Sequence, residues 1–206
     1  MVFSELKIVG IILAAGLSSR MGRVKSLLPW GDSLLLDRVI NNAYHSGLSS
    51  LVVVLGHEAE KIRKRIDFRG ARVIVNSDYA AGQSSSLRAG LDALPGGTDG
   101  AMFLLGDQPF VGAKIIDTLL CAFQKRQSSL IIPTYHGKRG NPVLLHSSTF
   151  EMVRKISGDT GARVLFRSLS GQVEEIEVGD PGILIDIDTL EDYQHYLCPP
   201  PAPPLH

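Results

Sequence analysis

Apolar residues occur along the chain in two patterns, as short continuous runs and as stretches in which they recur every three or four positions. Continuous runs of Val, Ile and Leu are typical of buried strands, and the recurring pattern is typical of helices packed against a sheet. Strands are predicted at residues 7–14, 50–56, 71–76, 100–106, 129–135, 141–146, 172–178 and 183–187. Helices are predicted at 33–46, 58–66, 84–94, 112–126, 147–156, 161–169 and 189–197. Strands and helices alternate in the first half, which predicts an α/β fold with a mostly parallel sheet covered on both faces.

The ends of the first four strands are the expected location of a ligand, because open α/β sheets bind ligands beyond the carboxyl ends of their strands. The loops that follow these strands begin at Ala15, Gly56, Asn76 and Gly106. We expect these four loops to share one edge of the sheet.

Two helix starts are indicated by residues that commonly cap helices. Asp32 or Ser33 is available as the N-cap of the helix at 33–46. Thr189, with Asp192 three residues later, is typical of the N-cap of the last helix.

The domain organisation expected from the sequence is simple. The 206 residues contain no internal repeat and no linker, so we expect one domain over residues 1–197. Residues 198–206, CPPPAPPLH, are rich in proline and are predicted to be disordered.

Composition and the N-terminal sequence indicate which partners the protein does not bind and where in the cell it is located. Lys and Arg number 21, as do Asp and Glu, so the neutral chain predicts neither nucleic-acid binding nor binding to an anionic membrane surface. Cys121 and Cys198 have no metal-ligand spacing and indicate reduced thiols. The N-terminus lacks the pattern of a signal peptide and its apolar run is too short to span a bilayer, so we expect a cytoplasmic protein.

A charged, glycine-containing loop follows the first strand in the stretch LAAGLSSRMGRVK, from Leu13 to Lys25. Gly16 and Gly22 flank Arg20, and such a loop can bring backbone N–H groups and cations to a triphosphate. The spacing matches neither a Walker A motif nor G-x-G-x-x-G. Taken alone, the loop is equally consistent with a solvated surface loop.

The same stretch resembles the signature L-A-[AG]-G-x-S-x-R-M-G-x-x-K of the nucleotidyltransferases that attach a nucleotide to the molybdenum cofactor. Further blocks occur in the order of that family: NSDYAAGQSSSLRAG, LLGDQPF, GKRGNPVLL, GDTGAR and DIDTLEDY. The forms L-A-A-G and G-Q-S-S-S-L are most similar to the cytidylyltransferase branch, including small accessory proteins for xanthine dehydrogenase maturation. The resemblance implies a three-layer, Rossmann-like nucleotidyltransferase fold, Mg²⁺ as cofactor, CTP and the molybdopterin cofactor as substrates, and a xanthine dehydrogenase-type apo-enzyme as a further partner.

Acidic residues follow two of the predicted strands. Asp107 comes directly after the strand at 100–106; alone it indicates a turn residue, but beside a triphosphate loop it suits a magnesium ligand. Asp186 and Asp188 alternate with isoleucines, so in an extended strand both would point to one face. The resemblance favours Asp188 as the second metal ligand, with Asp186 acting through water or by orienting Asp188.

The resemblance also implies roles for individual residues. Catalytic roles fall to Arg20, Lys25 and Asp107, with Arg20 and Lys25 holding phosphates. Nucleotide contacts are expected from Leu13, Ala14, Ala15, Gly16, Lys25, Asn76, Gln83, Ser84 and Asp107, and acceptor contacts from Asn141, Asp159 and Arg163. Gln83 and Ser84 open a predicted helix and are candidate base readers, although N-capping alone would also explain Ser84. We expect His57 and Trp30 to have packing roles.

The reaction expected from these features is transfer of CMP from CTP to the terminal phosphate of molybdenum-loaded molybdopterin. Three alternatives stay open at this point. The chain could be a non-catalytic chaperone of the cofactor, it could use GTP, or it could act on another phosphate such as a sugar phosphate.

Overall fold

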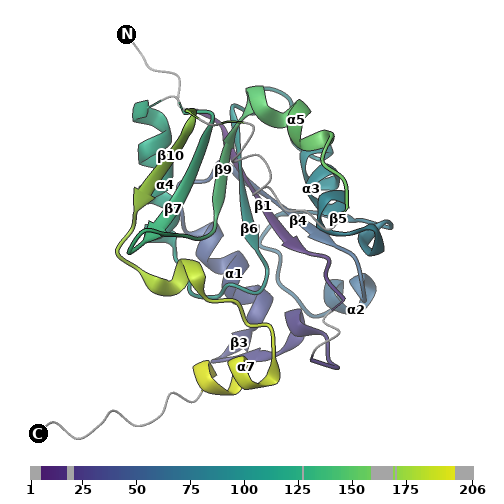
Figure 1. Ribbon diagram of the computed structural model, residues 1–206. Coiled ribbons are helices and arrows are strands. Elements are labelled where there is room, and N and C mark those ends of the chain that lie inside the picture. Colours follow the sequence, from purple (N-terminus) through teal and green to yellow (C-terminus); the bar gives the residue numbers. More distant parts are fainter. Residues whose placement is uncertain (1–5, 18–20, 127, 159–168, 170, 198–206) are drawn as a thin grey trace, which may run out of the picture.

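A mixed β-sheet forms the centre of the protein in the computed structural model, which describes residues 6–17, 21–126, 128–158, 169 and 171–197 (Figure 1). Within these residues its strands are β1 (Ile8–Ala14), β4 (Ser50–Leu55), β5 (Arg72–Val75), β6 (Gly100–Leu105), β7 (Leu130–Tyr135), β8 (Lys138–Arg139), β9 (Val143–His146) and β10 (Val173–Glu177). The strand order is β10-β7-β9-β6-β1-β4-β5, with β8 paired to β7. Strand β9 is antiparallel to both neighbours and β8 to β7, while the other pairs are parallel. The predicted α/β fold with a mostly parallel sheet is therefore confirmed.

The helices lie on both faces of this sheet and make three layers (Figure 1). They are α1 (Leu35–Tyr44), α2 (Ala59–Arg63), α3 (Gln83–Asp92), α4 (Ala113–Arg126), α5 (Phe150–Arg154) and α7 (Leu190–Leu197). Short 3₁₀ turns are η1 (Lys25–Leu27), η2 (Tyr79–Ala81), η3 (Ser147–Thr149) and η5 (Pro181–Leu184). None of the helices in the described ranges is both long enough and apolar enough to cross a membrane.

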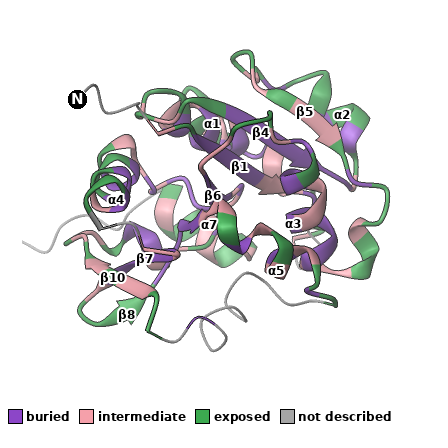
Figure 2. Cartoon of the chain, turned by 90° about the horizontal axis from the view of Figure 1, so that it is seen from above, coloured by how far each residue is buried: buried purple, intermediate pink, exposed green. Residues whose placement is uncertain are grey.

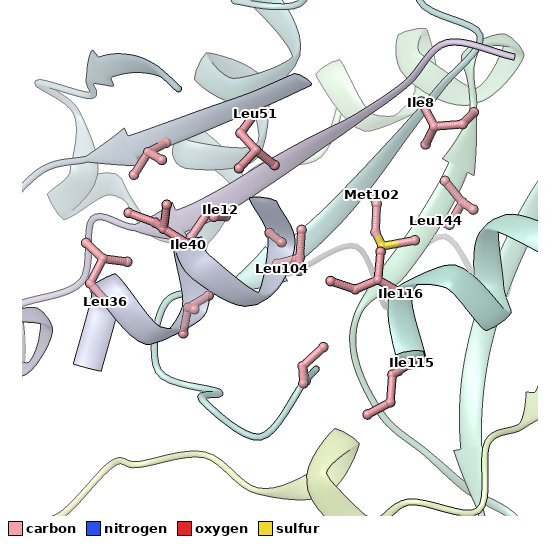
Figure 3. Packing of buried hydrophobic residues seen from close by; sticks show 14 of the residues in the cluster. Ile8, Ile12, Leu36, Ile40, Leu51, Met102, Leu104, Ile115, Ile116 and Leu144 are labelled. Carbon is pink, nitrogen blue, oxygen red and sulfur yellow. The ribbon is translucent and has the colours of Figure 1, made fainter. Parts of the chain in front are cut away.

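The side chains of β1 alternate between two hydrophobic clusters, as expected of a strand covered on both faces. Ile8 and Ile12 pack with residues of α1, α2 and α4, and Figure 3 shows Ile12 near Ile40 of α1. Val9 and Ile11 pack on the other face with residues of α3 and α5. Seen from above, buried residues are concentrated in the central strands, and exposed residues lie on the outer sides of the helices (Figure 2).

A third, smaller cluster joins the end of the chain to the segment after the charged loop. Leu28, Leu35 and Ile187 are its buried members. Trp30 packs among them, with its ring centroid 5.6 Å from that of Phe110 and close to aromatic residues of α7. This packing fastens the segment before α7 to the hairpin of β2 (Pro29–Trp30) and β3 (Ser33–Leu34).

Several predicted elements differ from the structure. The strand predicted at 183–187 is wrong: η5 ends at Leu184, and residues 185–188 have no strand partner in the described part of the chain. The helix predicted from residue 33 begins at Leu35, because Ser33 pairs within the hairpin, so neither predicted cap is used. The helix predicted at 147–156 is shorter and begins with a 3₁₀ turn. The helix predicted at 161–169 and the tail at 198–206 fall on residues that, apart from 169, lie outside the described ranges.

The contact between α3 and β1 depends on Gly90. A Cβ atom at this position would lie 2.5 Å from Cγ2 of the fully buried Ile11. We expect Gly90→Ala to lower the free energy of unfolding by about 1–2 kcal/mol, because overpacking outweighs the gain in helix propensity. Urea unfolding measures this, with Gly112→Ala, whose Cβ would meet nothing within 4 Å, as the control that should change little.

Candidate active site

A cleft of about 350 Å³ lies where β1 and β6 end, at the edge of the sheet predicted for the ligand. Its lining residues are Leu13, Ala14, Ala15, Gly16, Lys25, Ser26, Tyr79, Gly82, Gln83, Ser86, Leu105, Gly106 and Asp107. The two strand ends come close together at Gly106, where a Cβ atom would lie 3.0 Å from the carbonyl oxygen of Leu13. The cleft volume falls within the range of pockets for small molecules.

Lys25 joins two carboxylates at the wall of this cleft. Its Nζ donates hydrogen bonds to Oδ2 of Asp107 at 2.6 Å and to Oδ1 of Asp188 at 2.9 Å. The Lys25 side chain is 18% exposed, and those of Asp107 and Asp188 are 22% and 33% exposed. This partial burial makes the two ion pairs of Lys25 stronger than ion pairs on the surface. It still leaves all three side chains accessible to a ligand.

The ionisation of Lys25 is set by opposing influences. Burial alone lowers the pKa of its ammonium group, but the charges of Asp107 and Asp188 and the hydrogen bonds to them more than offset this, so the pKa is raised above the ordinary lysine value. Because the pKa is raised, the stabilisation from these pairs is present at neutral pH and is lost only when the pH rises through the folded-state value. Lys25 is therefore a fixed cation throughout the neutral range.

The position of Asp188 depends on its neighbours on both sides. The N–H of Ile187, a fully buried residue, donates to the carbonyl of Asp107 at 3.0 Å. On the other side, the N–H groups of Asp188 and Thr189 donate to the carboxylate of Asp192, and the Asp192 N–H donates to the Thr189 hydroxyl. The predicted N-cap at Thr189 is confirmed, and it fixes the backbone directly after Asp188.

Asp186 faces a different partner. Its Oδ1 accepts a hydrogen bond of 2.7 Å from Nε2 of Gln108. Partial burial, together with the negative charges of Asp107 and Asp188, raises the pKa of Asp186 above the ordinary aspartate value, against the opposing effect of the Gln108 hydrogen bond and Lys25. Asp186 is thus close enough to feel both carboxylates of the pair, and it is joined to Asp107 through the next residue, Gln108.

The start of α3 is held by hydrogen bonds among short polar side chains. The Asn76 side-chain amide donates to the hydroxyls of Ser85 and Ser86 at 2.8 and 3.0 Å, and its oxygen accepts from the N–H of Asp78. Ser85 in turn donates to backbone carbonyls of Asp78 and Gly82. Asn76 therefore positions the N-terminus of α3 from beneath, and the helix presents Gln83 and Ser86 to the cleft.

Not all of the residues implied by the family resemblance reach the cleft. Leu13, Ala14, Ala15, Gly16, Lys25, Gln83 and Asp107 line it, and Asp188 adjoins it through Lys25. Asn76 and Ser84 are buried below its surface, and Ser84 does not cap α3, whose N-cap is Gly82. Asn141 is buried, its N–H donates to the carbonyl of Ile183, and it is not among the residues that line the cleft. Arg20, Asp159 and Arg163 lie outside the described residues.

Sequence reasoning missed some cleft residues. Ser26, Tyr79, Gly82 and Ser86 line the cleft but were not among the expected contacts. Tyr79, Gly82 and Ser86 all belong to the block NSDYAAGQSSSLRAG, so extending the expected contacts along that block would have found them. The His57 ring lies with its centroid 6.0 Å from that of Tyr79, which is consistent with a packing role.

The carboxylates of Asp107 and Asp188 suit a divalent cation. Mg²⁺ prefers oxygen ligands and typically uses one or two carboxylates together with substrate phosphates. Oδ1 of Asp107 is buried and has no hydrogen-bond partner among the described residues, which leaves it available as a ligand. Within those residues no three His, Cys, Asp or Glu side chains gather around a common point, so the two carboxylates would be the protein's ligands and substrate phosphates would add further oxygen ligands to the cation.

Three known proteins are similar in sequence to this chain over most of its length. The chain is 31% identical over 198 residues to nicotine blue oxidoreductase of Paenarthrobacter nicotinovorans, covering 92% of this chain and 96% of that protein. It is 31% identical over 184 residues to molybdenum cofactor cytidylyltransferase of Escherichia coli K12, covering 89% and 92%. It is 30% identical over 200 residues to purine catabolism protein PucB of Bacillus subtilis 168, covering 90% and 94%.

Solved structures share the fold described above. Rv0371c of Mycobacterium tuberculosis H37Rv, in complex with manganese, superposes with a TM-score of 0.80 and is 29% identical, covering 93% of this chain and 98% of that chain. The MobA-like NTP transferase domain matches residues 10–174 of this chain. The chain therefore belongs to the family of MobA-like NTP transferase domains and is a nucleotidyltransferase.

Proposed function

We propose that this nucleotidyltransferase transfers CMP from CTP to the terminal phosphate of molybdenum-loaded molybdopterin, with Mg²⁺ as cofactor. An oxygen of the acceptor phosphate forms a bond to the α-phosphorus of CTP, and the bond from that phosphorus to the β-phosphate oxygen breaks. Pyrophosphate leaves with the electron pair. Because the acceptor phosphate is already ionised at neutral pH, the reaction needs no general base.

The observation that carries the proposal is the convergence of Lys25, Asp107 and Asp188 at the wall of the cleft. Lys25 would bind phosphate oxygens as a permanent cation, and Asp107 and Asp188 would hold the metal ion. When bound, the cation would neutralise charge on the triphosphate. Catalysis by these residues would consist of positioning and electrostatic stabilisation, as in other phosphoryl transfers.

The choice of CTP rests on two supports. The sequence L-A-A-G places Ala14 and Ala15 in the cleft lining, where a methyl group narrows the space for a larger purine base. One relative is also named as a molybdenum cofactor cytidylyltransferase. The relative named as an oxidoreductase is equally similar, so family membership alone does not select the substrate.

The recipient and compartment follow from the same proposal. Another relative is named as a purine catabolism protein, which supports delivery of the product to a xanthine dehydrogenase-type apo-enzyme. The cytoplasm is the compartment in which we place this step.

An assay that crosses nucleotides with acceptors tests the proposal. Purified protein is incubated with Mg²⁺ and either CTP or GTP, and with molybdenum-loaded molybdopterin, a sugar phosphate or no acceptor, and pyrophosphate is quantified. We expect release only with CTP and the molybdenum cofactor together. Release with GTP would overturn the nucleotide assignment, and release with a sugar phosphate the acceptor. Binding of the cofactor without release under any condition would identify a chaperone.

A further inference from the structure

Gln108 is a buried amide directly beside the carboxylate pair. It follows Asp107 in the chain, is 2% exposed, and donates from Nε2 to Oδ1 of Asp186 at 2.7 Å. Its Oε1 is buried and accepts no hydrogen bond from the described residues. The orientation of the amide follows from its partner, since a carboxylate oxygen accepts and the NH₂ group donates.

Stability of the fold does not explain a glutamine at this position. A buried amide oxygen without a donor costs free energy that an apolar side chain of similar size would not. The Asp186 residue that it contacts is exposed overall although its carboxyl group is partly buried, so water could replace Gln108 as a partner of that carboxylate. A buried amide whose oxygen accepts no hydrogen bond in the described part of the chain calls for an explanation other than packing.

Two hydrogen bonds join residues 107 and 108 to the segment that precedes Asp188, the second proposed metal ligand. Residues 185–188 have no strand partner in the described part of the chain. One bond runs from the N–H of Ile187 to the carbonyl of Asp107. A second runs from the side chain of Gln108 to Asp186. Together they join residues 107 and 108 to residues 186 and 187, and Asp188 is the next residue along.

We propose that Gln108 is a positioning residue for the metal site. Through Asp186 it holds residues 186–188 so that the carboxylate of Asp188 faces that of Asp107, without itself touching the metal ion. This inference rests on the proposed role of Asp107 and Asp188 as metal ligands. It assigns to Asp186 a place behind the site, as the group through which Gln108 acts.

Binding of Mn²⁺ to the protein without nucleotide, followed by electron paramagnetic resonance, tests the inference. Gln108→Leu is expected to weaken Mn²⁺ binding about 10-fold, as substitutions behind metal ligands typically do, while the thermal midpoint stays unchanged or rises. Gln108→Met, which keeps an unbranched side chain, is expected to behave in the same way and serves if the leucine variant folds poorly. Asp186→Ala is expected to weaken binding to a similar extent, and the double variant no further.

Two controls separate this inference from its alternatives. Asn42→Leu removes an amide that donates to the carbonyls of Pro109 and Val111 in the same loop but does not contact Asp186; an equal loss of Mn²⁺ affinity in this variant would show general loosening of the loop and overturn the proposal. Asp107→Asn is expected to abolish binding. If it does so while Gln108→Leu and Gln108→Met bind as the wild type, only the role of Gln108 is wrong. If Asp107→Asn binds normally, the proposed metal site and the role of Gln108 both fail.

Discussion

Asp107→Asn is expected to lower the rate of nucleotidyl transfer about 10²- to 10³-fold while leaving the protein folded. The substitution keeps the shape of the side chain but removes the charge at the centre of the proposed metal site. Lys25 retains its hydrogen bond to Asp188, so the ammonium group is not left without a partner. We therefore expect a loss of activity without a loss of stability, because the negative charge of Asp107 is needed for the reaction and not for folding.

Pyrophosphate release at saturating CTP and increasing Mg²⁺ concentration measures this effect. Asp99→Asn is the matched control, because Asp99 accepts a hydrogen bond from the N–H of Lys7 next to the start of β1, away from the carboxyl ends. It should retain full activity. If Asp107→Asn also retained full activity, Asp107 would have no part in the reaction and the cleft would need another interpretation.

The hydrophobic pattern was sufficient to predict the layers of the fold and the edge at which the cleft lies. It worked because β1 and its neighbours are buried on both faces, which requires continuous apolar runs. The same pattern could not predict that β9 is antiparallel, since the run Val143–His146 is equally apolar in either direction. Strand direction is decided by the connections and by pairing across the sheet.

The wrong strand at 183–187 shows a different limit. Its alternation of isoleucine and aspartate is typical of a half-buried strand. In the structure Ile187 is instead buried in the cluster with Leu28 and Leu35, so its burial is satisfied by side chains far away in the sequence. An alternating pattern predicts which residues are buried. It does not predict whether a sheet or another part of the chain buries them.

The site itself could be predicted only in part. Lys25 is 82 residues from Asp107 and 163 from Asp188 in the chain. The order of the family motifs predicted that these residues share a site, but only the structure shows that Lys25 bonds directly to both carboxylates. The resemblance implied a nucleotide contact for Asn76, and in the structure the amide of Asn76 donates to Ser85 and Ser86. Residue type alone does not distinguish a ligand contact from a local hydrogen bond.

Lys25→Met is expected to change metal binding and catalysis in opposite directions. The ammonium group of Lys25 donates to the same two carboxylates that we propose as metal ligands, so in the protein without nucleotide it competes with a divalent cation. Removing the charge while keeping an unbranched side chain frees both carboxylates. Mn²⁺ affinity without nucleotide should therefore rise about 10-fold, the equivalent of one charge-assisted hydrogen bond.

Nucleotidyl transfer by the same variant should fall about 10²-fold or more, because the ammonium group that we propose binds the phosphates is lost. The raised pKa of Lys25 keeps the wild-type group charged throughout the neutral range, so the difference between the two proteins should not depend on pH between about 6 and 9. Lys114→Met, on the exposed surface of α4, is the matched control and should alter neither quantity. A Lys25→Met variant with weaker Mn²⁺ binding would show that the lysine supports the metal site. A Lys25→Met variant with wild-type transfer would show that Lys25 does not bind the nucleotide. A lysine that both competes with the cation and holds the phosphates must, when removed, raise Mn²⁺ affinity and lower the rate of transfer.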